Sequence, residues 1–200
     1  MRVGAIVEGL GDRKSFPTLV AKTSQMFDKQ VFVHHLIECG GWGALKRDGG
    51  LERYGRLMAA SADIDTIIFA VDLDDGCPVE AVNLIEERRE NLSVQLNVPV
   101  SVCLLNREYE TWFLQDLLGI RQRSPEVEWV EGYEIANPLE IRDAKGAFSR
   151  AMRLTYRPSV DQDRFTKKMD LHSLLGESRS LRKLACVLSG LSHAEVQILA

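Results

Sequence analysis

Two short apolar runs in this chain each end in a carboxylate, and this feature constrains the fold most. Val3–Val7 is followed by Glu8, and Thr66–Val71 is followed by Asp72 and Asp74. Both runs are rich in β-branched residues and lead into loops that contain glycine, which is typical of buried strands in a parallel sheet. These acidic side chains are therefore expected at the carboxyl edge of the sheet, where open α/β sheets bind their ligands.

Carboxylates gathered at one sheet edge favour a metal site. Glu8, Asp72 and Asp74 would repel one another and raise each other's pKa unless a cation or a basic partner compensates them. Because hard oxygen ligands suit Mg²⁺ or Mn²⁺, we expect one of these ions as the cofactor. A structural alternative stays open, in which Glu8 caps the following helix and the aspartates only line a loop.

The bulk composition indicates one compact protein. The chain has 200 residues, of which 45% are hydrophobic, enough to bury one substantial core. It has no apolar run long enough to span a bilayer and no secretory signal pattern, so we expect a cytoplasmic protein without a membrane segment. The four cysteines are scattered without a CxxC pair and are expected to be reduced thiols.

Strands and helices are expected to alternate through residues 1–118. The expected strands are residues 3–7, 31–37, 66–71 and 98–105, and the expected helices between them are about residues 15–27, 51–62 and 78–91. This alternation favours parallel pairing with right-handed crossovers. The predicted fold class is α/β, with a Rossmann-like parallel sheet flanked by helices.

Residues 119–200 are expected to form a mostly helical extension packed on this core, in one compact domain. The candidate segments are an irregular acidic stretch at 124–140 and helices at 144–154, 165–175 and 180–188. Residues 142–183 carry 11 basic and 5 acidic side chains, whereas residues 1–141 carry 14 basic and 23 acidic ones. A basic lobe beside an acidic metal site would hold a polyanion. Solvated helix faces give the same charge pattern, so that alternative stays open.

Parts of the chain suggest three phosphate-related motifs. Lys14-Ser15 suggests a P-loop, but Arg13 stands where that motif requires glycine. A dinucleotide fingerprint fails because Lys14 replaces its third glycine. Asp72-x-Asp74 also fits the nucleophilic pair of haloacid-dehalogenase-like phosphatases, which leaves Glu8 unexplained and ranks second.

The acidic motifs together resemble a known fold. Glu8-Gly9-x-x-Asp12 followed by Asp72-x-Asp74 resembles the TOPRIM fold of topoisomerases, primases, recombination mediators and OLD-type nucleases. Over most of its length the chain resembles the TOPRIM-like family called domain of unknown function 4276. The further segments that carry this resemblance are Phe16-Pro17-Thr18-Leu19, Asp75-Gly76-Cys77-Pro78, Arg107-Glu108-Tyr109-Glu110, Lys145-Gly146 and Ser178-Arg179-Ser180-Leu181-Arg182-Lys183.

The resemblance implies metal-binding roles for the strand-end acids. Glu8 takes the position of the TOPRIM glutamate, and Asp72 and Asp74 take those of its metal-binding aspartates. Asp12 matches the second acid of the primase-like motif and is expected to contact a phosphate through a metal or a water.

Further acids and bases complete the expected site. Glu108 or Glu110 would add a second cation site, or else they form a capped, partly exposed helix start. The residues expected to bind the phosphate are Lys145, Arg179 and Arg182, with Arg13 and Lys14 as further candidates. Solvation of exposed basic side chains is the alternative for each of them.

We therefore expect a Mg²⁺-dependent nuclease or phosphotransferase acting on nucleic-acid phosphodiesters. Glu8, Asp72 and Asp74 would place one or two cations on the phosphate, and a basic residue such as Lys145 would offset charge in the transition state. The resemblance also implies partnership with an AAA- or ABC-type ATPase, as the effector of an anti-phage system, and leaves an oligomer possible. The alternatives are a non-catalytic module that binds nucleic acid or an ATPase, and a small-molecule phosphatase.

Overall fold

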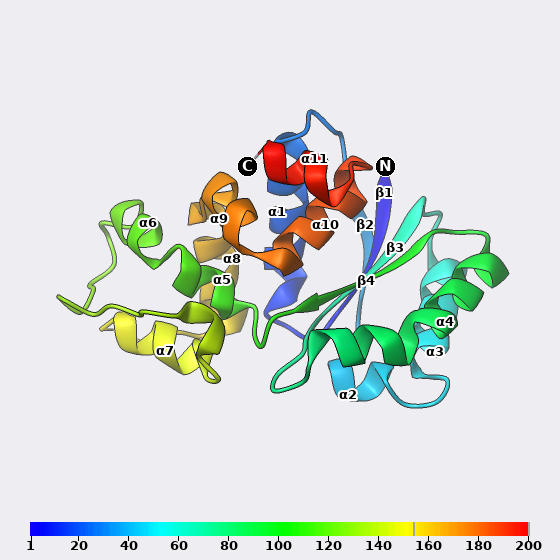
Figure 1. The fold of residues 1–200 in the computed structure, drawn as a ribbon, viewed down its shortest axis with the longest axis horizontal. Helices are drawn as coiled ribbons and strands as arrows, with labels where there is room; N and C mark the ends of the chain where they lie inside the picture. The colour runs from blue at the N-terminus through cyan, green and yellow to red at the C-terminus, as the bar shows by residue number, and fades with distance from the viewer. Residues whose placement is uncertain (154, 200) are drawn as a thin grey trace.

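Four parallel strands form the centre of the molecule. The computed structural model describes residues 1–153 and 155–199. The strands are β1 (Arg2–Val7), β2 (Phe32–Glu38), β3 (Thr66–Asp72) and β4 (Val100–Leu105). They form one sheet in the order β2-β1-β3-β4, with parallel pairing throughout (Figure 1). The predicted α/β class is confirmed, and the parallel sheet flanked by helices is consistent with a Rossmann-like fold.

The strand order creates a switch point between β1 and β3. From β1 the chain passes through α1 (Asp12–Gln25) to β2 at one edge, and from β3 through α4 (Pro78–Leu96) to β4 at the other. The two central strands therefore send their exit loops in opposite directions. Ligands of open α/β sheets bind in the crevice that such divergent loops leave at the carboxyl ends.

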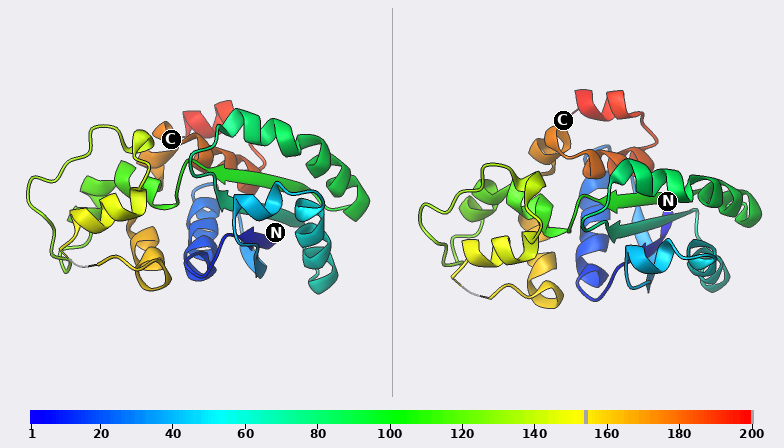
Figure 2. Two further views of the ribbon diagram at one scale, coloured as in Figure 1. Left: turned by 90° about the horizontal axis from the view of Figure 1, so that it is seen from below. Right: turned by 60° about the horizontal axis from the view of Figure 1, so that its bottom comes forward.

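Helices cover both faces of the sheet. α1 and α10 (Arg179–Ser189) lie on one face, and α3 (Gly50–Ser61) and α4 lie on the other (Figure 2). Successive side chains of a strand point to opposite faces. Within β3, Ile68 therefore belongs to the core under α1, whereas Ile67 and Phe69 belong to the core under α3 and α4. The short helix α2 (Trp42–Leu45) precedes α3.

The C-terminal helices share the core under α1. Phe148, Phe165 and Tyr156 are buried in the same cluster as Val3 and Leu19, and α8 packs against α1. The elements of this part are α5 (Glu110–Gln115), α6 (Leu117–Gln122), the 3₁₀ helix η1 (Pro138–Glu140), α7 (Ala144–Ala151), α8 (Pro158–Lys168), α9 (Leu171–Glu177), α10 and α11 (His193–Ile198).

Two of the predicted C-terminal elements differ from the structure. The single helix predicted over residues 165–175 is wrong, because the helix is interrupted between α8 and α9. At this interruption the Asp170 side chain accepts hydrogen bonds from the backbone N–H groups of His172 (3.1 Å) and Ser173 (3.4 Å). This capping starts a new helix. The predicted helix end at Leu154 lies outside the described residues, and α7 ends at Ala151. α11 was not predicted.

No helix among the described residues has both the length and the apolar character needed to cross a membrane. The four cysteines are free thiols, as expected from their spacing.

Phe148 anchors α7 to the rest of the core. Its ring centroid lies 4.9 Å from that of Phe165, 5.0 Å from that of Phe113 and 5.4 Å from that of Tyr156. We expect Phe148→Ala to lower the free energy of unfolding by about 3–5 kcal/mol, because it leaves a cavity among these rings. Urea unfolding followed by circular dichroism measures the loss. Val94→Ala, on the exposed side of α4, is the control and should change stability by less than about 0.5 kcal/mol.

Candidate functional site

Five carboxylates and one lysine converge at the carboxyl ends of β1 and β3. The carboxylate cluster consists of Glu8, Asp12, Asp72, Asp74 and Glu110, because the charges of Asp12 and Asp74 raise the pKa of Glu8 and those of Glu8, Glu110 and Asp12 raise the pKa of Asp72. The convergence follows from the topology, because Val7 pairs in register with Ala70 on adjacent strands. Glu8, one residue after Val7, and Asp72, two residues after Ala70, are thus brought to the same sheet edge.

Glu8 is half-buried and lacks an ion pair within 4 Å among the described residues. Burial raises the pKa of its carboxyl, and the charges of Asp74 and Asp12 raise it further. Gly41 makes room for this side chain, since a Cβ added there would lie 2.9 Å from Glu8 Oε2. Gly41 also has φ +88°, in the region that favours glycine.

Asp12 starts α1 and is fixed from two directions. Its Oδ2 accepts a hydrogen bond from the backbone N–H of Gly9 (3.1 Å), and its Oδ1 accepts one from Nε2 of Gln162 on α8 (2.8 Å). Burial raises the pKa of Asp12, and these two hydrogen bonds act against that rise. Gln162 was not predicted from the sequence. It lies 150 positions after Asp12, and nothing in its local pattern distinguishes it from a surface glutamine.

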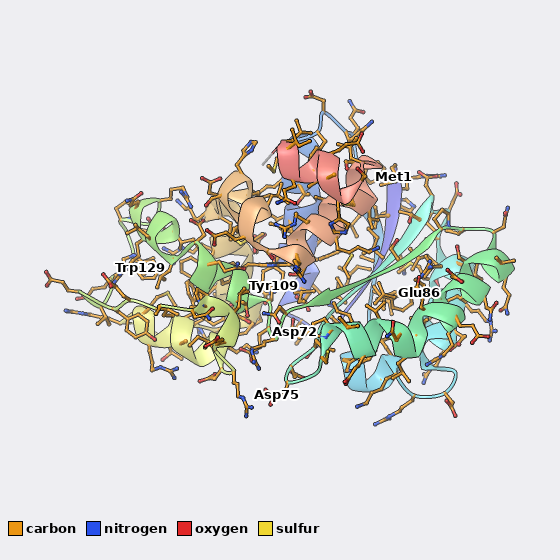
Figure 3. The ribbon with its side chains drawn as sticks, in the orientation of Figure 1. Met1, Asp72, Asp75, Glu86, Tyr109 and Trp129 are labelled. Atoms are coloured by element: carbon orange, nitrogen blue, oxygen red, sulfur yellow. The ribbon has the colours of Figure 1, made fainter. Side chains whose placement is uncertain are left out.

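Asp72 is the last residue of β3 and lies deep in the site. Its pKa is raised well above the ordinary range, first by burial and then by the charges of Glu8, Glu110 and Asp12. Figure 3 shows Asp72 at the end of the strands, between the loop that carries Asp75 and the helical part that begins near Tyr109. Burial without a compensating charge disfavours the charged form of this carboxyl.

Glu110 is the most deeply buried acid of the cluster. Only 1% of the residue is exposed, and its Oε1 has no hydrogen-bond partner among the described residues. Burial raises the pKa of Glu110 to about 6. The buried Tyr156 hydroxyl lies near this carboxyl and lowers its pKa, although no hydrogen bond of standard geometry joins the two among those residues. The partly exposed helix start that was the alternative for Glu110 is therefore wrong for this residue.

Lys145 supplies the positive charge of the site from the first turn of α7. Burial lowers the pKa of its ammonium, but the charges of Glu110, Glu108, Asp72 and Glu8 outweigh this effect and raise the pKa overall. Its backbone N–H donates a 2.7 Å hydrogen bond to Glu108 Oε2. Glu108 thus holds the start of α7, a structural use of the carboxylate that differs from the expected metal role.

The two other acids of the β3 exit loop differ from Asp72. Asp74 is exposed and has φ +53°, and it acts on Glu8 through its charge. Asp75 pairs with Arg107 (2.9 Å) and with Arg142 (3.4 Å). No arginine among the described residues forms such a pair with Glu8, Asp72 or Asp74.

The predicted phosphate-binding arginines lie elsewhere or have structural partners. Arg13 pairs with Glu38. Arg182 donates to the carbonyl oxygens of Leu175 and Gly176, the latter at 2.8 Å, and so caps the end of α9. Arg179 is exposed and lines a groove beside β4, and Lys14 is exposed at the start of α1. Of these predicted bases, Lys145 is the one whose charge acts on the carboxylate cluster.

The described side chains do not form a ready coordination shell. Among residues 1–153 and 155–199, no three His, Cys, Asp or Glu side chains are arranged to hold a metal ion. The charges of the cluster raise the pKa of Glu8 and Asp72, yet the carboxylates are not gathered around one point. The donor set of oxygens still has the chemistry that Mg²⁺ or Mn²⁺ prefers.

No protein-family model, curated protein or solved structure matches this chain. The resemblance to TOPRIM proteins therefore stays a prediction from the motifs.

Replacing Glu110 by glutamine tests the burial of its charge. A folded-state pKa of about 6, raised from 4.5, means that the folded protein binds this proton more tightly than the unfolded chain. The resulting stabilisation is present below pH 4.5 and is lost as the pH rises through about 6. The side chain of Glu110→Gln stays neutral. At pH 8 and without divalent cations, the free energy of unfolding of this variant should therefore be about 1–2 kcal/mol higher than that of wild type.

Urea unfolding at pH 8 and pH 4 measures the effect of Glu110→Gln. The advantage over wild type should disappear at pH 4, where both side chains are neutral. Glu87→Gln, at an exposed position of α4, is the control and should show no such pH dependence. A Glu110→Gln protein that is less stable than wild type at both pH values would contradict a buried, uncompensated charge.

Replacing Gly41 by alanine tests the contact with Glu8. Gly41→Ala should cost about 1–3 kcal/mol, from backbone strain at positive φ and from the close approach of its Cβ to the Glu8 carboxylate. The contribution of the contact should vanish in a Glu8→Ala background, whereas the backbone strain stays. A double-mutant cycle of unfolding free energies separates the two, and additive effects would show that the carboxylate is not held against Gly41.

Proposed function

We propose that this protein is a Mg²⁺- or Mn²⁺-dependent enzyme that cleaves or transfers nucleic-acid phosphodiesters, with the carboxylate cluster as its cation site. The observation that carries the proposal is the buried Glu110 carboxylate, which has no ion pair within 4 Å among the described residues and whose charge raises the pKa of Asp72. Buried charges are normally paired, so a buried carboxylate without an ion pair beside other acids favours a positively charged ligand.

The charges of the cluster support a cation. The positive charge of Lys145 lowers the pKa of four carboxyls, those of Glu8, Asp12, Asp72 and Glu110. One positive charge thus faces several carboxylates. A divalent ion would lower the pKa values that burial and mutual repulsion raise. Glu8, Asp72 and Glu110 would hold it, and Asp74, being exposed, is free to turn toward it. When bound, such an ion polarises a phosphoryl oxygen.

Lys145 has the position of a phosphate partner. It lies in the first turn of α7, next to the acids but without an ion pair within 4 Å among the described residues. Its ammonium is thus available to a phosphate held at the strand ends, where it would offset the charge that develops on the phosphoryl oxygens. Asp12, held by Gln162 and the Gly9 backbone, is fixed in place to contact the same phosphate through a metal ion or a water.

A nucleic acid as the substrate is supported by the basic character of residues 142–183. Part of this charge is already compensated, because five of its eleven basic side chains pair with acids. These residues are Arg142, Arg150, Arg153, Arg164 and Lys167. The expected basic lobe is therefore weaker than its composition indicates. An ATPase partner and a role in anti-phage defence rest on the TOPRIM resemblance alone.

One observation favours a second candidate, a non-catalytic module that binds nucleic acid or an ATPase. The described side chains contain no arrangement of three metal-binding groups. In this alternative Lys145 alone compensates the carboxylates and no cation enters.

A cleavage assay with Mg²⁺ or Mn²⁺ on labelled single- and double-stranded oligonucleotides tests the proposal. We expect wild type to cleave only with the ion, and Asp72→Asn and Glu8→Gln each to lose at least about 100-fold in rate, because each removes a ligand charge. Glu87→Gln, on the exposed side of α4, should stay within about twofold of wild type. Titration calorimetry with Mn²⁺ should show binding that Asp72→Asn weakens.

The remaining outcomes separate the alternatives. Cleavage that survives both substitutions would place the activity outside the carboxylate cluster. Nucleic-acid binding without cleavage, unchanged in both variants, would favour the non-catalytic module. Turnover of a small phosphomonoester in place of oligonucleotides would favour the phosphatase.

A further inference from the structure

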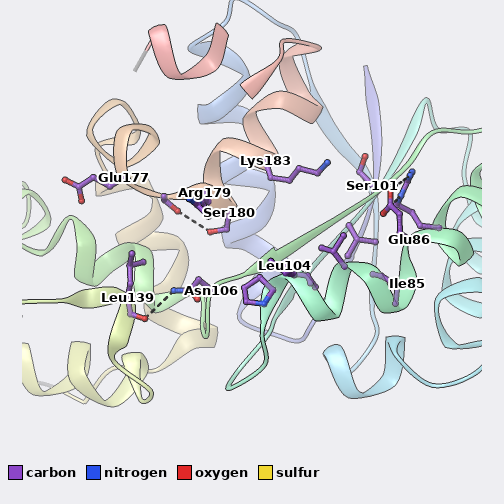
Figure 4. A pocket seen from close by; sticks show the side chains of 16 residues that line it. Ile85, Glu86, Ser101, Leu104, Asn106, Leu139, Glu177, Arg179, Ser180 and Lys183 are labelled. Carbon is purple, nitrogen blue, oxygen red and sulfur yellow. Dashed lines mark hydrogen bonds and ion pairs between the residues drawn. The ribbon is translucent and has the colours of Figure 1, made fainter. Parts of the chain in front are cut away.

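A groove follows the free edge of the sheet, away from the carboxylate cluster. Within residues 1–153 and 155–199, β4 pairs only with β3, and a cavity of about 880 Å³ lies along its open side. α4 forms one wall with Val79, Val82 and Ile85, and the start of α10 forms the other with Arg179, Ser180 and Lys183 (Figure 4). The floor includes β4 itself.

The hydrogen bonds of the sheet show which backbone groups of β4 face this groove. Ile67 donates to the carbonyl oxygen of Pro99 (2.9 Å) and Leu73 to that of Leu105 (3.1 Å), so alternate residues from 99 to 105 bond to β3. The backbone groups of Val100, Val102 and Leu104 consequently point to the open edge.

One end of this edge is already covered. The N–H of Val100 donates to Ser93 Oγ (3.3 Å), and its carbonyl accepts from Arg89 (3.0 Å), both from α4. No side chain of the described residues bonds the backbone of Val102 or Leu104. Two donors and two acceptors are thus left along the groove, which is the pattern that an added strand satisfies.

The two walls differ in chemistry. On α4, Val79 is 67% exposed and Val82 is 39% exposed, so this wall presents apolar surface to solvent. The acid on this wall, Glu86, pairs with Arg89 (2.7 Å). On the opposite wall, Arg179 and Lys183 have no ion pair among the described residues. Figure 4 shows Lys183 extending along the groove toward Ser101, with Glu177 at the far end.

We propose that this groove binds an extended peptide segment of a partner protein, in which apolar and acidic residues alternate, as an added strand on β4. The backbone of the peptide pairs with Val102 and Leu104. Because side chains of a strand alternate between faces, one set packs on Val79 and Val82 while the other meets Arg179 and Lys183. A second copy of this chain fits the groove less well. Antiparallel pairing of two β4 edges about a two-fold axis would place the two basic α10 walls side by side, where their charges repel.

Fluorescence anisotropy with synthetic peptides at low salt tests the proposal. The probe is fluorescein-labelled acetyl-Glu-Val-Glu-Val-Glu-Val-amide, and the control replaces each glutamate by lysine. We expect the acidic peptide to bind at least about tenfold more tightly than the lysine peptide, and Lys183→Glu to remove this preference. Lys29→Glu, an equal charge change at an exposed position outside the groove, should leave the preference intact.

Backbone pairing is tested separately with two N-methylated forms of the acidic peptide. One carries the methyl groups on its valine nitrogens and the other on its glutamate nitrogens, and only the form methylated on the edge that faces β4 should lose binding. Hydrogen exchange at the Val102 and Leu104 amides should slow in the bound complex. The proposal is wrong if neither peptide binds, if both methylated forms bind like the parent, or if sedimentation shows a dimer in which the same two amides are already protected.

Discussion

The repulsion among desolvated carboxylates at the ends of β1 and β3 is the constraint on which the candidate site depends. The sheet order places these two strands side by side, so the topology alone brings Glu8 and Asp72 to the same sheet edge. Burial then raises the pKa of each. A single buried, uncompensated charge costs enough to be a sizeable part of the marginal stability of a domain.

Lys145 reduces this cost, and it does so from a helix that comes more than seventy residues after Asp72 in the chain. For its ammonium to reach the acids, α7 must dock on the core. The aromatic rings of Phe113, Phe148 and Phe165 provide that docking, and Glu108 holds the first turn of α7 through the Lys145 backbone. The packing of the C-terminal helices and the electrostatics of the strand ends are thus coupled, because the helices that bury the aromatic rings also place the compensating charge.

The sequence was sufficient to predict the features that local patterns determine. Apolar runs rich in β-branched residues marked the strands, and the acids that follow them marked the sheet edge, so Glu8 and Asp72 were expected where they lie. The burial of Glu110 was not predictable in this way, since it depends on α7 and Tyr156 packing over a helix start. The Gln162 contact to Asp12 depends on α8 lying against α1, a pairing of distant segments that no local periodicity encodes.

The way this chain pairs its other acids argues for a function at the carboxylate cluster. Asp75 has Arg107 and Arg142, Glu52 has Arg88 at 2.7 Å, and even the buried Asp116 has Arg123. Arginine is therefore the usual partner of a carboxylate in this structure. At the strand ends, by contrast, the described residues give Glu8, Asp72 and Glu110 no ion pair within 4 Å, although these are among the acids that burial affects most. Perturbed acids also arise in structural ion-pair networks, but there each acid has its basic partner in contact, whereas here the partner is at a distance and the acids face one another. This contrast supports the proposal that a positively charged ligand binds at the carboxylate cluster.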